Sequence, residues 1–379
     1  MNCKNTFHIV TLEFISHTQG TARYGSKIVL EKRIKEWNNS GVSCHRLSSL
    51  PLAIRPMGVE FMLWLIYAFL RIIEFYRQQL CHIILCSSHD FFNLWPAFMA
   101  SKVLNIPYIV VVHHLSGAEL AGGLIKRYMF RVREGFKKME SLLFGILSII
   151  NQKVLLKSKN IVAVSKSTRE QLMKIGIKEC KVIYNGIEDL SELYYKNNAA
   201  NESSKEYDAI YIGRISPDKG TFDLIEIWKI VVKRKSTAKL IIIGGGLPYY
   251  IQKLKELIKM YGLVGNVTFS GVVSDKEKIL LMSRSKILIL PSHNEGFCLT
   301  ISEALSAGLP VVAYELPAII EVYGECPSVL LVRKGDYEGF ARNILMLINN
   351  DNLRRELSEK ATSFIKELAQ KFSWKHSSN

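Results

Sequence analysis

The sequence contains few cysteines and no paired-cysteine motif. Its seven Cys residues are scattered over 379 residues without a C-x-x-C pair. Zinc sites and dithiol redox sites normally carry such pairs, so the sequence predicts neither, and we expect free thiols in a reducing compartment. A D-x-D sequence is also missing. The sequence therefore shows no acidic pair for a divalent cation, and we expect neither a metal nor another cofactor.

Long hydrophobic runs are missing as well. The most apolar run, residues 61–70, ends at Arg71, far short of the about 20 residues that span a bilayer. The chain passes from Met1 through polar residues into an expected strand by His8, without the pattern of a signal peptide. We therefore expect a cytoplasmic protein with no transmembrane helix.

Acidic residues are outnumbered by basic ones. The chain has 50 Lys and Arg against 34 Asp and Glu, a formal net charge of +16. This balance favours an anionic partner, which leaves a phosphorylated substrate, an acidic membrane face and nucleic acid as alternatives. No aromatic-rich RNA-binding motif accompanies the charge, so no nucleic-acid partner is predicted.

Short apolar runs alternate with helical patterns along the whole chain. This alternation predicts parallel sheets, whose ligands lie outside the carboxyl ends of the strands. The fold class is therefore α/β, with two Rossmann-like parallel-sheet domains facing a cleft. The expected strands are residues 8–14, 83–86, 108–112, 160–165, 181–184, 208–212, 239–243, 266–273, 286–290 and 311–314. The clearest expected helices are residues 27–37, 59–79, 95–104, 166–175, 336–349 and 353–368.

Composition sets the expected domain boundaries. Hydrophobic residues make up 48% of the chain, which suffices for two cores at this length. Residues 189–205 are polar and rich in Asn, Ser and Ala, as in a linker. We expect an N-terminal domain over 1–188, the linker over 189–205, a C-terminal domain over 206–360, and a returning helix over 361–379.

Two common nucleotide-binding fingerprints fail in this sequence. Residues 213–220 read G-R-I-S-P-D-K-G, and a P-loop would need Gly where Asp218 stands. Gly244 and Gly246 begin a dinucleotide fingerprint, but Tyr249 occupies its last Gly position. The first of these loops instead predicts a diphosphate clamp, because Arg214 can fork onto phosphate oxygens and Lys219 adds a point charge.

The stretch from Pro291 to Pro310 holds two carboxylates in a strand–loop–helix pattern. An apolar strand, residues 286–290, leads into the loop E-G-F at Glu295, and Glu303 follows about one turn into a helix. Such a junction aims loop N–H groups and a helix N-terminus at one place, which suits an anion. Each carboxylate can accept hydrogen bonds from two neighbouring hydroxyl groups, as a sugar or ribose offers.

These motifs resemble the retaining glycosyltransferases of family 4, which have the GT-B architecture and an E-x7-E motif. The resemblance implies that Glu295 contacts the donor sugar and that Glu303 holds the ribose. It also implies that the G-R-x4-K-G loop places Arg214 and Lys219 on the diphosphate. Backbone contacts to the donor are implied for the following residues: Gly296, Phe297, Cys298, Leu299 and Thr300 around the sugar and diphosphate, and Val272 and Val273 at the base.

The N-terminal half carries the resemblance less closely. Gly20 begins a G-T-A-R-Y run like that beside the family's donor phosphates, although Gln19 replaces the first Gly. His113, at the end of a buried strand, matches a position that commonly faces the sugar, while its neighbour His114 replaces the usual Asp. The resemblance therefore implies catalytic roles for Glu295, His113, Arg214 and Lys219, with a structural role for His113 as the alternative.

The resemblance implies a retaining transfer of a sugar from a nucleotide-sugar donor to a glycan or lipid-linked acceptor, in cell-surface polysaccharide or glycoconjugate synthesis. Two alternatives remain: an epimerase or phosphorylase of the same architecture, and a non-catalytic basic module for membrane or RNA. Residues 126–139 form an expected basic amphipathic helix, which predicts either peripheral binding to an anionic membrane or packing against its own domain.

Overall fold

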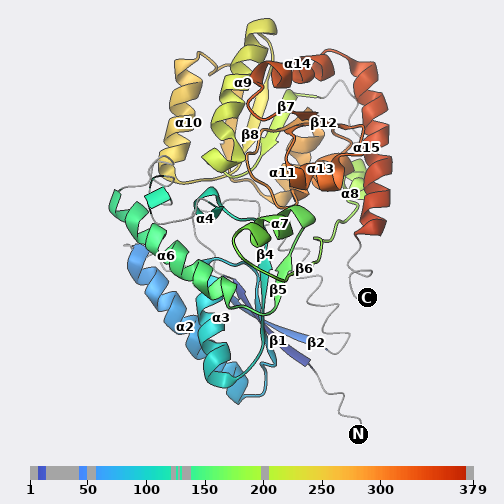
Figure 1. Ribbon diagram of the computed structural model, residues 1–379. Coiled ribbons are helices and arrows are strands. Elements are labelled where there is room, and N and C mark those ends of the chain that lie inside the picture. Colours follow the sequence, from blue (N-terminus) through green and yellow to red (C-terminus); the bar gives the residue numbers. More distant parts are fainter. Residues whose placement is uncertain are drawn as a thin grey trace. The chain divides into compact units, whose positions relative to one another are not determined.

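The computed structural model describes residues 7–13, 42–48, 57–120, 125–126, 129, 138–197 and 205–372 (Figure 1). The Gly20 loop, the expected helix over 27–37 and most of the basic stretch 126–139 lie outside these residues. The described chain divides into two compact units, and it passes from the first to the second between Ile183 and Tyr184. We call them the N-terminal unit and the C-terminal unit.

The N-terminal unit is a parallel sheet of strand order β2-β1-β3-β4-β5-β6. Strands β3 and β4 begin and end where the sequence predicts, and β5 and β6 are shorter than expected. The six strands are β1 (Phe7–Glu13), β2 (Val42–Ser48), β3 (Ile83–Cys86), β4 (Tyr108–Val112), β5 (Ile161–Ala163) and β6 (Lys181–Val182). The helices are α2 (Met57–Arg77), α3 (Phe91–Leu104), α4 (Gly117–Leu120), α6 (Lys138–Leu156) and α7 (Lys166–Lys174).

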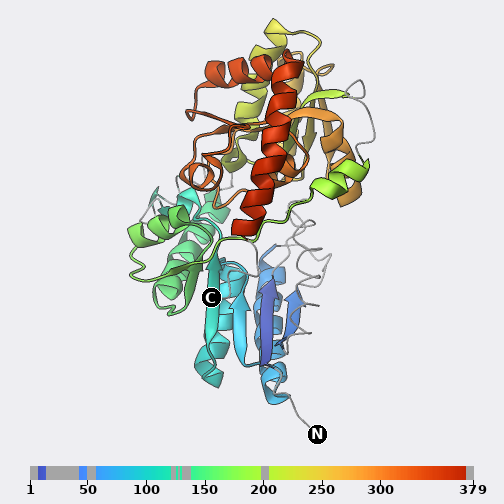
Figure 2. The same cartoon turned by 90° about the vertical axis from the view of Figure 1, so that its right-hand side faces the viewer.

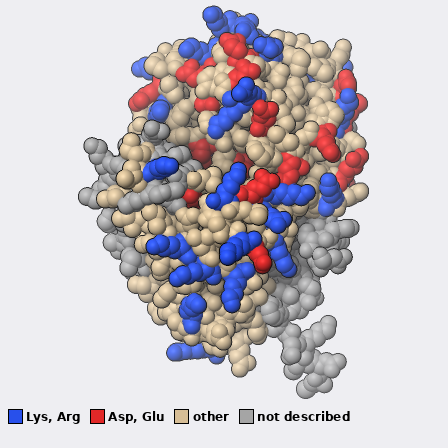
Figure 3. All heavy atoms as spheres, in the orientation of Figure 1, with Lys and Arg blue, Asp and Glu red and all other residues tan. Residues whose placement is uncertain are grey.

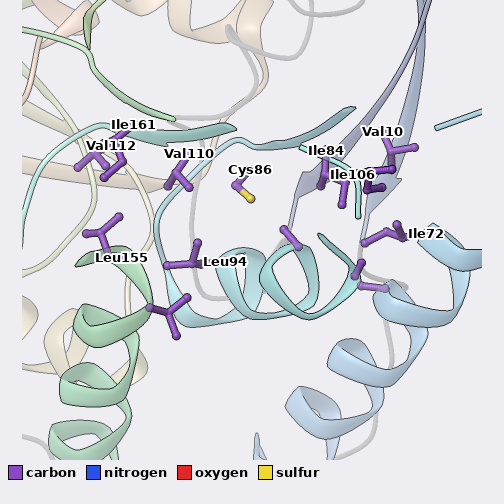
Figure 4. Packing of buried hydrophobic residues seen from close by; sticks show 14 of the residues in the cluster. Val10, Ile72, Ile84, Cys86, Leu94, Ile106, Val110, Val112, Leu155 and Ile161 are labelled. Atoms are coloured by element: carbon purple, nitrogen blue, oxygen red, sulfur yellow. The ribbon is translucent and has the colours of Figure 1, made fainter. Parts of the chain in front are cut away.

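Helices α2, α3 and α6 share a core with the sheet (Figure 4). Ile84 and Val110 of the sheet lie over Ile72 of α2 and Leu94 of α3, and all four side chains are fully buried. Helix α7 begins after Ser165, whose hydroxyl accepts the Thr168 N–H as a cap. Strands of a parallel sheet are covered by helices, so they read as continuous apolar runs. This is why the short apolar runs of the sequence correspond to these strands.

The C-terminal unit is a second parallel sheet, of order β12-β11-β10-β7-β8-β9. Its strands are β7 (Tyr207–Ile212), β8 (Leu240–Ile243), β9 (Val267–Gly271), β10 (Ser285–Leu290), β11 (Val311–Tyr314) and β12 (Val329–Val332). Its helices are α8 (Ser191–Asn197), η2 (Pro217–Lys219), α9 (Thr221–Arg234), α10 (Pro248–Met260), α11 (Asp275–Ser283), α12 (Leu299–Ser306), α13 (Pro317–Tyr323), α14 (Tyr337–Ile348) and α15 (Asp351–Lys371). The α/β class with two parallel sheets is confirmed.

The expected domain boundaries stay predictions, and two helices lie across the segments that they define. Helix α8 forms inside residues 189–205, which composition predicted as linker, because Tyr194 is buried and its hydroxyl donates to Met282 Sδ at 3.2 Å. Helix α15, the long red helix along the C-terminal unit in Figure 2, runs continuously through residues 360 and 361. Its buried residues Leu357, Ala361 and Ile365 form one stripe, so no separate helix begins at 361.

Strands β7 and β10 pair at the middle of this sheet, with Leu288 opposite Ile210. Their carboxyl ends therefore lie side by side. The clamp loop (residues 213–220) leaves β7 there, and the carboxylate loop (residues 291–298) leaves β10. Residues far apart in sequence thus meet at one edge of one sheet.

Candidate functional site

The clamp loop and the carboxylate loop are in close backbone contact. Gly220 has φ +64°, and a Cβ on it would lie 1.7 Å from the Pro291 carbonyl oxygen. Any side chain there would force the loops apart, so the site requires glycine at this position. The His293 N–H also donates to the Asp218 carbonyl oxygen at 2.9 Å.

Lys219 and Glu295, both predicted site residues, form an ion pair. Lys219 Nζ lies 2.8 Å from Glu295 Oε1, and the two side chains are only 19% and 11% exposed. The same ammonium donates to the Asn294 carbonyl oxygen at 3.3 Å. The cation predicted for phosphate and the carboxylate predicted for sugar are therefore neighbours.

Arg214 is held at the opening of the clamp loop. Its Nη2 donates to Asp218 Oδ2 at 2.8 Å, and its Nε donates to Ser216 Oγ at 3.3 Å. Burial opposes ionisation of Asp218, but the Arg214 guanidinium and the Ser216 hydroxyl hold the pKa of that carboxyl below its usual range. The buried hydroxyl of Tyr211 lies within hydrogen-bond distance of the Arg214 and Lys219 carbonyl oxygens, which fixes the loop from beneath.

The carboxylate loop ends in an unusual backbone conformation at Cys298. This residue has φ +63° and stands at the N-cap of α12, and its carbonyl oxygen accepts the Tyr323 hydroxyl at 3.0 Å. Burial raises the pKa of the Cys298 thiol well above its ordinary value, so the thiol stays protonated at neutral pH. The residue shapes the loop rather than supplying a nucleophile.

Phe297 anchors the same loop from the inside. It is 2% exposed, and its ring contacts Tyr184, Tyr323 and Phe372 at centroid distances of 6.3, 6.4 and 6.0 Å. These aromatic contacts stabilise the loop around the buried Gly296. Leu299 and Thr300 follow on the more exposed side.

Glu303, the second carboxylate of the E-x7-E motif, pairs with a lysine that the sequence did not single out. Lys278 Nζ lies 2.9 Å from Glu303 Oε1, and both side chains are mostly buried. Lys278 comes from α11, and Asp275 on the same helix lies 3.9 Å from its Nζ. Val272 and Val273 lie between β9 and α11; Val272 is exposed and Val273 is buried.

His113 belongs to the N-terminal unit and follows β4. Its Nε2 lies 2.9 Å from the Ser87 carbonyl oxygen, and its own carbonyl oxygen accepts the Thr168 hydroxyl at 3.3 Å. The ring is thus oriented by the loop after β3. Its role toward a sugar stays a prediction, and so does that of Gly20, which lies outside the described residues.

A buried ion pair near His113 was not predicted from the sequence. His89 Nε2 lies 3.0 Å from Glu119 Oε1, and Glu119 Oε2 accepts the Ser116 N–H and hydroxyl, both at 2.7 Å. Burial opposes both charges, but their attraction raises the pKa of His89 and lowers that of Glu119 to about 2. The pair joins the loop that follows β3 to helix α4.

Within the described residues, no group of three or more His, Cys, Asp or Glu side chains is arranged to hold a metal ion. Metal independence remains a prediction, because a donor diphosphate could itself contribute ligands to a cation.

Two sequence families match the chain in succession. Residues 24–189 match the family described as Glycosyltransferase Family 4, and residues 196–364 match the family described as Glycosyl transferases group 1. Together the two matches span most of the chain and both of its structural units.

Individual relatives are distant. An uncharacterised glycosyltransferase of Methanocaldococcus jannaschii is 27% identical over 72% of this chain and 66% of its own length. The capsular polysaccharide biosynthesis glycosyltransferase CapM of Staphylococcus aureus is 25% identical over 63% of each chain. The matches thus span slightly less than two thirds of these relatives' lengths.

A solved structure shares the fold. HepE of Anabaena, determined in complex with UDP and glucose, is 17% identical, with a TM-score of 0.66 over 98% of this chain and 100% of that chain. This likeness shows the two-domain fold alone. Together with the two family matches and the E-x7-E and G-R-x4-K-G motifs, it shows that the chain belongs to the family 4 glycosyltransferases of GT-B fold.

Proposed function

We propose that this protein is a retaining glycosyltransferase that moves a sugar from a nucleotide-sugar donor to a glycan or lipid-linked acceptor. The observation that carries the proposal is the Lys219–Glu295 pair at the adjoining ends of β7 and β10. It holds a phosphate-binding cation against a carboxylate suited to sugar hydroxyls. That arrangement fits a sugar diphosphate, whose charged and hydroxylated ends lie next to each other.

The clamp would act mainly on the leaving group. Arg214 presents a planar guanidinium and Lys219 an ammonium with three N–H donors. Negative charge on the diphosphate grows as the glycosidic bond breaks, so both cations would bind the transition state more strongly than the donor. Lys219 would then turn from Glu295 to a phosphate oxygen and leave Glu295 to the sugar hydroxyls, so that the sugar lies beside the diphosphate.

The second carboxylate would hold the nucleoside. We propose that Glu303 accepts the two ribose hydroxyls while Lys278, 2.9 Å away, keeps it ionised and fixes its orientation. The backbone near Val272 and Val273 precedes the helix that carries Lys278. Base, ribose, diphosphate and sugar would thus be bound in order by β9, α12, β7 and β10.

The relatives' names support a place in cell-surface polysaccharide synthesis. CapM is named for capsular polysaccharide biosynthesis, and the HepE structure contains UDP and glucose. On this basis we propose a donor of the nucleoside-diphosphate-sugar class and a saccharide or lipid-linked acceptor. We further propose that the reaction needs no metal, since Arg214 and Lys219 would supply two positive charges to the diphosphate.

The test is a panel of nucleotide sugars with the purified protein. A donor should raise the melting temperature by mass action, and free nucleoside diphosphate should appear only when an acceptor is added. Release without acceptor and with inorganic phosphate would instead indicate a phosphorylase. Interconversion of donors without nucleotide release would indicate an epimerase, and no response to any donor would favour a non-catalytic binding module.

We also propose peripheral binding to an anionic membrane surface. Within the described residues, no helix is both long and apolar enough to cross a bilayer. Helices α2, α3 and α6 nevertheless expose apolar side chains outward. The exposed apolar residues of these helices include Ile66, Leu70, Met99, Val103, Leu142, Ile146 and Ile150.

Basic residues accompany this apolar surface. Arg77, Lys102 and Lys153 are exposed on the same three helices, and Lys and Arg predominate over acidic side chains across the lower part of Figure 3, which these helices occupy in Figure 1. On α6 the outward positions Leu142, Ile146 and Ile150 repeat every four residues, so they form one stripe. Apolar side chains beside basic ones fit a lipid surface with anionic head groups.

A further inference from the structure

The carboxylate loop is joined to α9, the helix that follows the clamp loop, by a side-chain bond that does not use either predicted cation. His293 Nε2 lies 2.8 Å from Asp223 Oδ2. We propose that His293 is a positioning residue, which keeps the two loops in register while Lys219 exchanges Glu295 for the donor diphosphate. This inference rests on the proposed function, because it needs a diphosphate for Lys219 to bind.

His293 contacts the clamp loop and the helix behind it at once. Its backbone N–H donates to the Asp218 carbonyl oxygen at 2.9 Å, and its ring reaches Asp223 in the first turn of α9. Two residues later in the carboxylate loop stands Glu295. The position of the Glu295 carboxylate relative to the clamp therefore depends on where His293 is held.

Asp223 is itself firmly placed. The Tyr314 hydroxyl donates to the same Oδ2 atom at 3.0 Å, and Tyr314 is the fully buried last residue of β11. Burial opposes ionisation of Asp223, but the bonds from His293, Tyr314 and Tyr337 hold the pKa of this carboxyl below its usual range. His293 is thus bound to a carboxylate anchored on the central sheet, and its ring also lies 5.9 Å from that of Tyr314.

Lys219 makes the competing connection between the same two loops. Its ammonium reaches the Asn294 carbonyl oxygen and the Glu295 carboxylate. A diphosphate would draw this ammonium away from one or both, because its three N–H groups cannot serve every acceptor equally. The His293–Asp223 bond involves no atom of Lys219, so it persists through the exchange and fixes the spacing of phosphate and sugar sites.

Two substitutions distinguish the contribution of the His293–Asp223 hydrogen bond from that of the packing of the His293 ring. His293→Gln keeps an N–H donor at nearly the reach of Nε2, whereas His293→Phe keeps a ring beside Tyr314 and removes the donor. We expect His293→Phe to raise the donor KM and lower kcat/KM by roughly tenfold to a hundredfold, the range for a lost bond to a charged group, and His293→Gln to recover most of the loss. Glu338→Gln, which weakens the exposed ion pair between Arg234 of α9 and Glu338 of α14, is the matched control and should behave as wild type.

A measurement without donor keeps the inference separate from the proposed function. Amide hydrogen exchange across residues 291–298 and 216–220 should quicken in His293→Phe and stay slow in His293→Gln. Wild-type kinetics and exchange in a folded His293→Phe would overturn the proposal, as would a His293→Gln variant as impaired as Phe. If wild type binds none of UDP, GDP or ADP in a thermal shift, the proposed donor class fails. The positioning role is judged separately by amide exchange, and equal exchange in wild type and His293→Phe would overturn it.

Discussion

Lys219 Nζ lies 2.8 Å from Glu295 Oε1, at the point where two adjacent central strands end. In the absence of donor, each of these groups satisfies the charge of the other in a mostly buried setting, where an unpaired charge is costly. A donor that brings its own anion can replace the carboxylate as partner of Lys219, and its hydroxyls can replace the lysine as partner of Glu295. The ion pair therefore keeps both side chains in place for the donor, and the donor can then replace each of them as the partner of the other.

The first prediction concerns the diphosphate clamp. Arg214→Ala and Lys219→Ala should each lower kcat as well as donor affinity, because the cations stabilise charge that grows on the leaving group. Loss of one such donor costs about 10²–10³ in kcat. Steady-state kinetics at saturating donor would measure it, and Lys229→Ala, whose half-exposed side chain pairs with Glu226 on α9, is the control. Unchanged kcat in both clamp variants would contradict the assignment.

The second prediction concerns Glu303. Glu303→Ala should weaken donor binding by about 1–3 kcal/mol, the range for a lost charge-assisted hydrogen bond, with a smaller change in kcat. Because Lys278 would lose the nearer of its two carboxylate partners, the variant should also melt at a lower temperature. The double variant Glu303→Ala/Lys278→Met should recover stability without recovering affinity. Calorimetric titration with the donor measures the affinity. An affinity equal to wild type in a folded variant would refute the ribose role.

Most of the fold could be predicted from the sequence, because parallel strands buried on both faces form continuous apolar runs. Residues 83–86, 108–112 and 311–314 became strands β3, β4 and β11 without any shift. The linker over 189–205 stays a prediction, but composition gave no sign of helix α8 inside it, which is held by one buried tyrosine, Tyr194. Strand β2 was missed because V-S-C-H-R-L-S holds few apolar residues.

The site was predictable where it depends on local motifs and unpredictable where it depends on pairing. Arg214, Lys219, Glu295 and Glu303 stand in short, recognisable loops. Arg214 finds its partner Asp218 in its own loop, but Lys219 pairs with the distant Glu295 and Glu303 with Lys278. The supporting bond between His293 and Asp223 likewise joins residues 70 positions apart. No periodicity or spacing links such residues, since only the order of strands in the sheet brings them together.

The third prediction is a pH dependence of stability from the buried His89–Glu119 pair. The pKa of His89 is raised above 6.5, so its contribution is complete below 6.5 and is lost as the pH rises through the folded value. The pKa of Glu119 is lowered from 4.5 to about 2, so its contribution is complete above 4.5 and is lost as the pH falls toward 2. The pair should therefore stabilise the protein most between these limits.

Thermal melts of wild type and Glu119→Gln between pH 4.5 and 9 would measure this contribution. The wild-type advantage should be largest near pH 5 to 6 and shrink at alkaline pH, as His89 loses its proton. Glu74→Gln, which breaks the exposed Arg71–Glu74 pair on α2, should show no such profile. A difference between wild type and Glu119→Gln that is constant over this range would contradict the pairing.

The fourth prediction is that turnover survives chelation. With donor and acceptor saturating, added EDTA should leave kcat unchanged, because Arg214 and Lys219 offset the charge of the leaving diphosphate. The assay needs protein dialysed against chelator and metal-free substrates, with a metal-dependent transferase as a positive control. Loss of activity that Mg²⁺ restores would show that the diphosphate recruits a cation, and would refute this part of the proposal.

The fifth prediction is reversible binding to anionic vesicles. Each Lys or Arg near an anionic leaflet contributes about 1 kcal/mol, but only charges within a Debye length, about 8 Å at physiological salt, count in full. The basic residues of the stretch 126–139 should attract the protein to the anionic surface, and the exposed apolar residues of α2 and α6 should add binding by entering it. Sedimentation with phosphatidylglycerol vesicles should show binding that fades as salt is added.

Two sets of variants distinguish the contributions. Replacing Arg131, Arg133, Lys137 and Lys138 by Gln should weaken binding mainly at low salt, whereas Leu70→Ser with Ile146→Ser should weaken the binding that remains at high salt. Met260→Ser, at an exposed apolar position on α10 of the C-terminal unit, is the control and should bind as wild type. Equal binding to neutral vesicles, or none to either kind, would defeat the membrane proposal. The net charge of +16 would then serve only to attract anionic donors and to keep the protein soluble.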